Sequence, residues 1–260
     1  MPVYRIDLAY DGTGFRGWAR NAGVRSVQGE IEAALARTLG AEVPLSVAGR
    51  TDAGVHARHQ VASFPAATEI DAAVVLRSLR TMLGPEIAVH DLAAAPEGFD
   101  ARFSAVRRSY RYFIDEAPSH DPLRSRWVWH RGETLDLAAM NQAAAAFVGP
   151  HDFASLCRPA DGGTTERTVE SAGWERGAVS GQRSAVSQIE GESGVGLLVY
   201  SVSAKAFCHQ MVRSMVALCV DVGRGRIRAE AVPEILEKRD RNAARGVAPA
   251  HGLVLWEVEY

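Results

Sequence analysis

The sequence lacks long hydrophobic runs and has only three cysteines, Cys157, Cys208 and Cys219. Their number is odd and no two are spaced C-x-x-C, which argues against a disulfide framework and against a metal site built on thiolates. No apolar run approaches the roughly 18 residues needed to cross a bilayer, so we expect no membrane partner. The first residues show no signal core and no cleavage site, and we therefore expect a cytoplasmic protein.

Lysine is almost absent as well. Lys205 and Lys238 are the only lysines among the 29 basic residues, and the others are arginine. Arginine suits phosphate contacts and stacking on bases, although genomic base composition is the simpler explanation of its excess. The net charge of −2 argues weakly against nucleic acid when taken alone, but the placement of the charges matters more than their sum.

Hydrophobic periodicity divides the 260 residues into two similar parts. Each part reads as strand, helix, strands, helix and strand, which indicates a duplicated α+β unit. We place the boundary near Phe103, which gives parts 1–102 and 103–260. The polar segment from Gly177 to Gly194 is expected to be a long loop or an insertion, and the sequence assigns it no role.

Alternation and helical spacing set the bounds of the expected elements. Strands are predicted at Tyr4–Tyr10, Val43–Ala48, His59–Phe64, Ile87–Leu92, Phe103–Asp115, Thr165–Trp174, Gly196–Ala204 and Leu253–Tyr260. Helices are predicted after the N-cap residues Ser26, Asp71 and Asp136, and from about Phe207 to Val222.

The segment from Gly49 to His56 holds the clearest candidate for chemistry. It follows a short apolar strand and places Asp52 two residues after Arg50, between two glycines. A turn of this kind displays one carboxylate at the rim of a cleft, and an ion pair can keep it ionised where burial would favour the neutral form. An ionised carboxylate held out of water can act as a nucleophile or a base. Asp and Gly are also ordinary turn residues, so Thr-Asp-Ala-Gly alone would indicate only a turn.

Two other segments carry functional side chains in unusual settings. Tyr110 lies in an arginine-rich strand, where its ring would serve as a stacking platform for a base. The structural alternative is an edge strand with solvated arginines. Arg213 lies in an otherwise apolar helix, where a buried arginine needs a partner. The alternative here is a side chain that reaches the helix surface.

The segment from Gly12 to Gly17 matches G-x-G-x-x-G after a strand. A dinucleotide-binding fold requires a helix that begins at the third glycine and an acidic residue at the end of the next strand. Residues Trp18 to Arg25 are loop-like instead, so no nucleotide cofactor is expected. His56 and His59 are three apart in a turn and a strand, with no third ligand evident, so no metal is expected.

Four segments resemble motifs of the TruA family, the tRNA pseudouridine synthases A. Ala48–His56 resembles the active-site motif, and Arg107–Tyr112 resembles a block whose first tyrosine lies against the target base. Ala206–Met215 resembles a third block, with Gln210 where the family usually has histidine and Ser214 where it often has asparagine. The stretch around Tyr10 and Trp18 resembles the family's N-terminal RNA-contacting block.

The resemblance implies an α+β fold in which two ferredoxin-like halves form a continuous, mostly antiparallel sheet with a central catalytic cleft. It implies that Asp52 is the catalytic residue and that Tyr110 packs on the target base. It also implies that Arg50 and Arg213 hold Asp52 ionised and clamp phosphate. The expected partners are tRNA and a second copy of the chain, and no cofactor is implied.

The implied reaction converts uridine to pseudouridine at position 38, 39 or 40 in the tRNA anticodon arm. The N1–C1′ bond breaks, the uracil turns, and C5 bonds to C1′, so substrate and product are isomers. The target base must be exposed for this chemistry. It is open which tRNAs are served and whether Asp52 attacks C1′, adds to the pyrimidine ring or acts through the 2′ position. Two alternatives remain: an RNA-binding module in which Asp52 only supports a turn, and a nicotinamide-dependent oxidoreductase that uses Gly12 to Gly17.

Overall fold

The computed structural model describes residues 1–158, 163–176, 197–244 and 246–260. The chain forms two compact units, one of residues 1–108 and 254–260 and the other of residues 109–253. The first unit thus includes the last strand of the chain, which the division of the sequence grouped with the second part. The segment from Gly177 to Gly194, expected as a loop or an insertion, lies outside the described residues.

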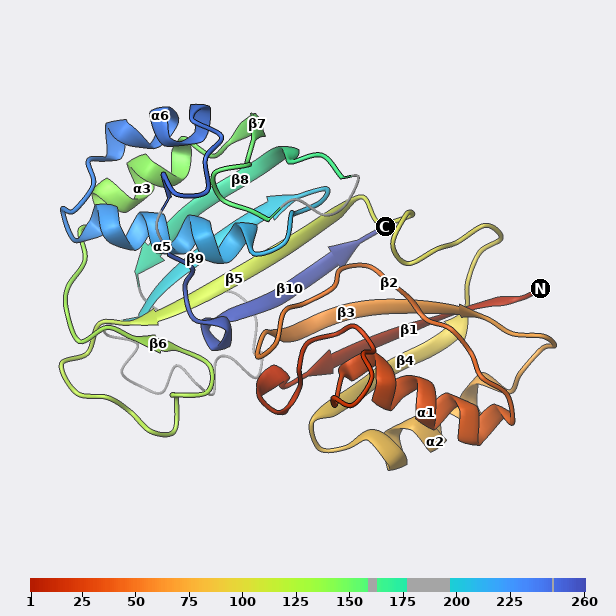
Figure 1. The fold of residues 1–260 in the computed structure, drawn as a ribbon. Coiled ribbons are helices and arrows are strands. Elements are labelled where there is room, and N and C mark those ends of the chain that lie inside the picture. The colour runs from red at the N-terminus through yellow and green to blue at the C-terminus, as the bar shows by residue number, and fades with distance from the viewer. Residues whose placement is uncertain (159–162, 177–196, 245) are drawn as a thin grey trace. The chain divides into compact units, whose positions relative to one another are not determined.

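The first unit combines a small sheet with two helices (Figure 1). Its elements are β1 (Val3–Tyr10), α1 (Val27–Leu39), β2 (Ser46–Val47), β3 (His56–Pro65), α2 (Ala72–Leu83), β4 (Ile87–Ala94) and β10 (Leu253–Glu259). β1 pairs antiparallel with β3 and β4, β2 pairs antiparallel with β3, and β10 pairs parallel with the start of β3. The order β4-β1-β3-β2 with two crossover helices is the ferredoxin-like arrangement that was expected.

One face of this sheet contributes to the core of the first unit. Every second side chain of β1 is buried, namely Tyr4, Ile6, Leu8 and Tyr10. α1 and α2 pack against each other, and α2 packs against β4. Ser26 and Asp71 accept hydrogen bonds from the backbone amides of Gly29 and Val74, which confirms both as N-caps.

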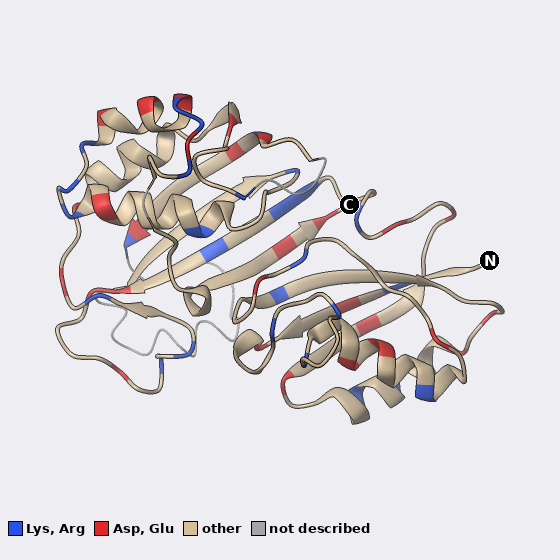
Figure 2. Cartoon of the chain, in the orientation of Figure 1, with Lys and Arg blue, Asp and Glu red and all other residues tan. Residues whose placement is uncertain are grey.

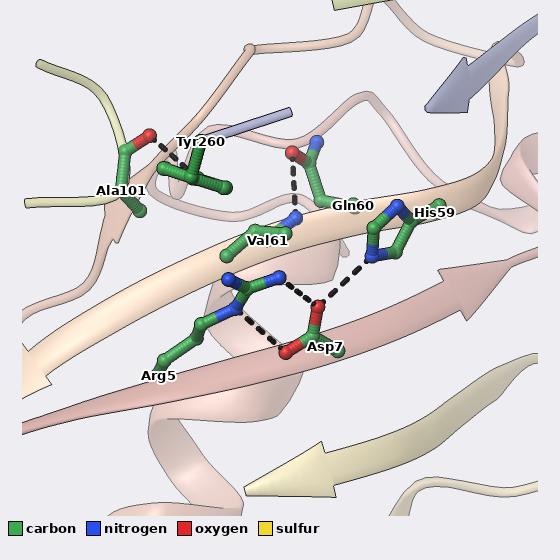
Figure 3. Close-up of polar contacts among 7 residues, drawn as sticks. All are labelled: Arg5, Asp7, His59, Gln60, Val61, Ala101 and Tyr260. Atoms are coloured by element: carbon green, nitrogen blue, oxygen red, sulfur yellow. Dashed lines mark hydrogen bonds and ion pairs between the residues drawn. The ribbon is translucent and has the colours of Figure 1, made fainter. Parts of the chain in front are cut away.

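The other face of β1 and β3 is polar (Figure 3). The Asp7 carboxylate accepts hydrogen bonds from Nε and Nη2 of Arg5, at 2.8 Å and 2.6 Å, and lies 2.9 Å from Nε2 of His59. The Arg5 guanidinium also lies over the Tyr260 ring, 4.8 Å from its centroid. Tyr260 in turn donates a hydrogen bond of 2.8 Å to the Ala101 carbonyl, so these contacts join the first and last strands of the chain within one unit.

The second unit repeats the pattern of the first. Its elements are β5 (Arg107–Asp115), β6 (Trp129–His130), α3 (Leu137–Ala145), β7 (Gly149–Asp152), β8 (Glu166–Arg176), β9 (Leu197–Ala204), α5 (Met211–Gly223) and α6 (Val232–Glu237). The strand order is β5-β9-β8-β7, with β6 parallel to the end of β5. β8 pairs antiparallel with both β7 and β9. Apart from the short strands β6 and β7, the succession β5, α3, β8, β9, α5 matches that of β1, α1, β2, β3, α2, which supports the expected duplication.

Helices α3 and α5 form the core of the second unit together with its sheet. α3 packs against α5 and against β8. The Tyr200 hydroxyl on β9 donates to Sδ of Met215 at 3.7 Å, which places α5 against β9. Asp136 caps α3 by accepting a hydrogen bond from the Ala139 amide, as predicted. Figure 2 shows basic residues on β5, and one basic and one acidic residue on the mostly apolar α5, namely Arg213 and Asp221.

Three predicted bounds are wrong by several residues. The strand expected at Val43–Ala48 is only β2, and the strand expected from Phe103 begins at Arg107. Phe103 is 77% exposed in the turn before β5, so its apolar side chain does not mark a buried strand. The helix expected from Phe207 begins at Met211, because Gln210 adopts a left-handed conformation with φ of 64°.

The α+β class and the mainly antiparallel pairing are confirmed. The catalytic cleft between the two parts stays a prediction. Across the described ranges, no helix combines the length and the apolar character that crossing a bilayer requires.

Candidate active site

Asp52 lies on the turn that joins β2 to β3 in the first unit. The turn closes through a hydrogen bond of 3.1 Å from the Val55 amide to the Asp52 carbonyl. Gly54 adopts a φ of 79°, a conformation that favours glycine, so the pattern Asp-Ala-Gly fits the turn that was predicted. The Asp52 side chain is half-buried, whereas Arg50 is exposed two residues earlier. An exposed guanidinium is accessible to a phosphate group, and its ion pair with Asp52 stays a prediction.

The N-terminal loop is fixed against this turn. The Gly12 amide donates a hydrogen bond of 3.0 Å to Nδ1 of the buried His56, and the Trp18 amide donates one of 3.0 Å to the Thr51 carbonyl. Gly17 has a φ of 97°, and a Cβ there would lie 2.9 Å from the Thr51 carbonyl oxygen. The glycines of this loop therefore allow its backbone to approach the turn that carries Asp52.

This arrangement contradicts a dinucleotide-binding role for Gly12 to Gly17. The segment forms a short 3₁₀ helix, η1 (Gly12–Gly14), followed by a loop, and α1 begins only at Val27. No helix among the described residues begins at the third glycine, where such a fold would bind pyrophosphate at a helix N-terminus. The nicotinamide-dependent alternative therefore has no structural support.

The aromatic residues of the expected RNA-contacting block face the core. Tyr10 and Trp18 are 4% and 0% exposed, and their ring centroids are 6.0 Å apart. The exposed basic residues of this segment are Arg16 and Arg20. Contact of this segment with RNA stays a prediction.

His56 and His59 do not form a shared metal site. They are three residues apart on β3, and each contacts a different group. His59 lies against Asp7, and His56 accepts the Gly12 amide. Within the described part of the chain, no group of three or more potential His, Cys, Asp or Glu ligands is found.

The arginines that begin β5 have structural partners that the sequence did not reveal. Arg108 is 7% exposed and donates from Nε to the Ala48 carbonyl at 2.9 Å and from Nη2 to the Arg102 carbonyl at 2.7 Å. Arg107 forms an ion pair with Glu259 on β10, with Nε 2.8 Å from Oε1. The alternative of a solvated arginine is therefore wrong for Arg108, whereas the Arg107 side chain is paired but 43% exposed. The residues next to an arginine in the sequence do not reveal that it is buried and bound to carbonyl groups.

Tyr110 and Arg213 belong to the second unit. Tyr110 is 8% exposed, and its ring meets that of Phe207 edge to face with centroids 5.1 Å apart. Arg213 is half-buried on α5, where Nε donates a hydrogen bond of 2.7 Å to the Ala248 carbonyl. The Ala248 amide donates back to the Arg213 carbonyl at 3.1 Å. The contacts of both residues with Asp52, which lies in the first unit, stay predictions.

The two departures from the family pattern also have defined surroundings. Ser214 is buried and accepts a hydrogen bond of 2.9 Å from Nη1 of Arg241. Gln210 supplies the left-handed residue directly before α5. Arg213 lies in the first turn of α5, which begins at Met211.

Comparison with known proteins gives a consistent result over the whole chain. A family model described as tRNA pseudouridine synthase matches residues 143–260. The tRNA pseudouridine synthase A of Leifsonia xyli subsp. xyli is 41% identical, over 99% of this chain and 91% of its own length. The proteins of the same name from Streptomyces griseus and Frankia casuarinae are 42% and 43% identical, each over 98% of this chain and over 87% and 88% of their own lengths.

These similarities define a pseudouridine synthase, an enzyme of the isomerase class. The chain belongs to the tRNA pseudouridine synthase A family.

Proposed function

We propose that this enzyme converts uridine to pseudouridine in the anticodon arm of tRNA, at position 38, 39 or 40. The observation that carries the proposal is the Asp52 turn, which several backbone contacts hold in one conformation within a chain of this family. The names of the relatives support tRNA as the substrate. The anticodon positions rest on the resemblance of the sequence motifs.

In this proposal Asp52 acts as the nucleophile or base. The N1–C1′ bond of uridine breaks and a C5–C1′ bond forms, while the C5 hydrogen leaves as a proton and N1 gains one. Tyr110 packs on the uracil and assists removal of the C5 proton. Arg50 and Arg213 contact phosphate and favour the ionised carboxylate, because a nearby positive charge stabilises the charged form. Three routes stay open for Asp52: attack at C1′, addition to the ring and reaction through the 2′ position. Each route gives the same overall change in bonds and protons.

The remaining parts of the proposal concern partners. We infer a homodimer whose charged surface binds tRNA, acting in the cytoplasm without a metal or cofactor. Because the reaction is an isomerisation, it requires no redox carrier and no nucleoside triphosphate.

Release of tritium from tRNA that carries [5-³H]uridine tests the activity. Wild-type enzyme should release tritium, and Asp52→Asn should lower the rate by at least about 10³-fold, within the range of general acid–base and nucleophilic groups. The affinity of Asp52→Asn for tRNA should stay within a few-fold. Asp71→Asn is the matched control, because asparagine also caps a helix and Asp71 lies at the start of α2.

The outcomes separate the alternatives. If wild-type enzyme binds tRNA but releases no tritium, the chain is an RNA-binding module and the proposed activity is wrong. Transcripts that keep a single uridine at position 38, 39 or 40 then test the site of modification. Tritium release from none of the three would overturn the assignment to the anticodon arm while leaving pseudouridine synthesis elsewhere in tRNA.

A further inference from the structure

The backbone of the segment leading into Asp52 is held at four of its carbonyl groups. Its carbonyl groups accept hydrogen bonds as follows: Ala48 from Arg108 Nε at 2.9 Å, Gly49 from Gln60 Nε2 at 2.7 Å, Thr51 from the Trp18 amide at 3.0 Å and Asp52 from the Val55 amide at 3.1 Å. Two of these partners are side chains, and one of them, Gln60, lies outside the motifs that identified the site. A turn with so many fixed carbonyls has little freedom to reorient its side chains.

Among the donors to these carbonyl groups, Gln60 is the central residue. It lies on β3 with 0% of its surface exposed. One amide hydrogen reaches the Gly49 carbonyl, and the other reaches the Tyr10 hydroxyl at 3.3 Å. Its oxygen accepts the Val61 amide at 3.2 Å (Figure 3). Because a carbonyl can only accept, the Gly49 contact fixes which end of the Gln60 amide faces the turn.

Tyr10 extends the contact from Gln60 to the residue before Asp52. Its hydroxyl lies 2.8 Å from Oγ1 of Thr51, and both groups are buried. Burial raises the pKa of Tyr10 to about 12, so the hydroxyl keeps its proton near neutral pH. Since the Tyr10 oxygen accepts from Gln60, its proton is directed to Thr51. A buried hydroxyl left without an acceptor would be unfavourable.

We propose that Gln60 and Tyr10 are positioning residues for Asp52. The hydrogen-bond chain from Gln60 through Tyr10 to Thr51, together with the direct bond from Gln60 to Gly49, fixes the peptide units on the N-terminal side of Asp52. It thereby sets the direction of the carboxylate without contacting the substrate. This inference rests on the proposed role of Asp52, because only a reacting carboxylate would need such control.

Variants that each lose a single hydroxyl test the hydrogen-bond chain and leave the rest of each side chain in place. Tyr10→Phe and Thr51→Val should each lower kcat by about 10- to 100-fold, since small misplacements of a reacting group have effects of this size. The affinity for tRNA should stay within about two-fold, because neither buried hydroxyl faces solvent. Thr51→Ser, which keeps the hydroxyl, should restore kcat to within about three-fold of wild type. The double variant should be about as slow as either single variant, because both remove the same contact.

Tyr4→Phe is the matched control for lost stability. Tyr4 is a second buried tyrosine on β1, and its hydroxyl accepts the Ile70 amide at 3.0 Å, away from the turn. Its loss should lower the melting temperature about as much as Tyr10→Phe and leave kcat unchanged. The inference is overturned if Tyr10→Phe and Thr51→Val keep wild-type kcat, or if Tyr4→Phe slows the enzyme equally. Failure of the proposed function shows differently, as full activity in Asp52→Asn.

Discussion

Gly12 lies so close to Val55 that a Cβ on Gly12 would be 2.0 Å from the Val55 carbonyl oxygen. The obstacle is backbone, so any larger residue must displace either the N-terminal loop or the turn that carries Asp52. We predict that Gly12→Ala lowers the free energy of unfolding by about 1–3 kcal/mol, as overpacking does in protein interiors. Turnover of uridine in tRNA should fall at least about tenfold, because the turn shifts with Val55.

Gly173→Ala is the control for this prediction. A Cβ on Gly173 would lie 3.7 Å from Oδ1 of Asn141, an ordinary contact, and the residue lies in β8 of the second unit. Urea denaturation and tritium release measure the two effects. Wild-type turnover in a destabilised Gly12→Ala enzyme would show that the N-terminal loop does not determine where Asp52 lies.

Local signals in the sequence were sufficient for much of this site. Ser26, Asp71 and Asp136 are N-caps as predicted, because a cap depends on neighbours three residues away. The prediction of a turn at Asp52 is confirmed for the same reason, since Gly54 supplies the required positive φ. Features of this kind follow from a few adjacent residues and can be recognised without an alignment.

The supports of the site could not be predicted in this way. Arg108 binds the Ala48 carbonyl 60 positions earlier, and Gln60 binds that of Gly49 through a buried amide. In the sequence, Arg108 is one arginine among several on a strand, and Gln60 is one polar residue in a mixed run of polar and apolar residues. Their roles depend on which backbone groups the fold leaves without partners, and periodicity carries no such information.

Arg50 tests the contribution of the turn to binding. The side chain is exposed, so we expect it to contact phosphate. Arg50→Ala should raise KM for tRNA several-fold, leave kcat less affected, and lower the slope of log affinity against log salt by about one. Arg77→Ala, an exposed arginine on α2, should change neither quantity. An unchanged salt slope in Arg50→Ala would exclude a phosphate contact at this residue.

Asp7 predicts a pH dependence of stability in the first unit. Burial alone would raise the pKa of the Asp7 carboxyl, but the hydrogen bonds from His59 and Arg5 outweigh it and lower the pKa below its usual value. The stabilisation is therefore fully present above the unfolded pKa of about 3.9, and it is lost as the pH falls through the lower, folded value.

The corresponding measurement is urea unfolding between pH 7 and pH 3. The free energy of unfolding of wild-type enzyme should decrease below about pH 4, and Asp7→Asn should show a shallower decrease with lower stability at neutral pH. Asp71→Asn, at an exposed cap, should follow the wild-type curve. Parallel curves for Asp7→Asn and wild type would mean that another group controls the acid transition.

Two variants of Tyr110 distinguish packing on the base from proton transfer. Tyr110→Phe removes only the hydroxyl and keeps the aromatic ring, which contacts Phe207. We predict that Tyr110→Phe keeps tRNA affinity within about two-fold and lowers tritium release by about 10²-fold or more, as loss of a proton-transfer group does. Tyr110→Leu should also weaken binding, because stacking on a base contributes about 1–3 kcal/mol. Tyr200→Phe, which loses only a weak contact to Met215, should remain fully active. If Tyr110→Phe released tritium at the wild-type rate, the hydroxyl would have no part in removing the C5 proton, and the ring alone would account for the role of this residue.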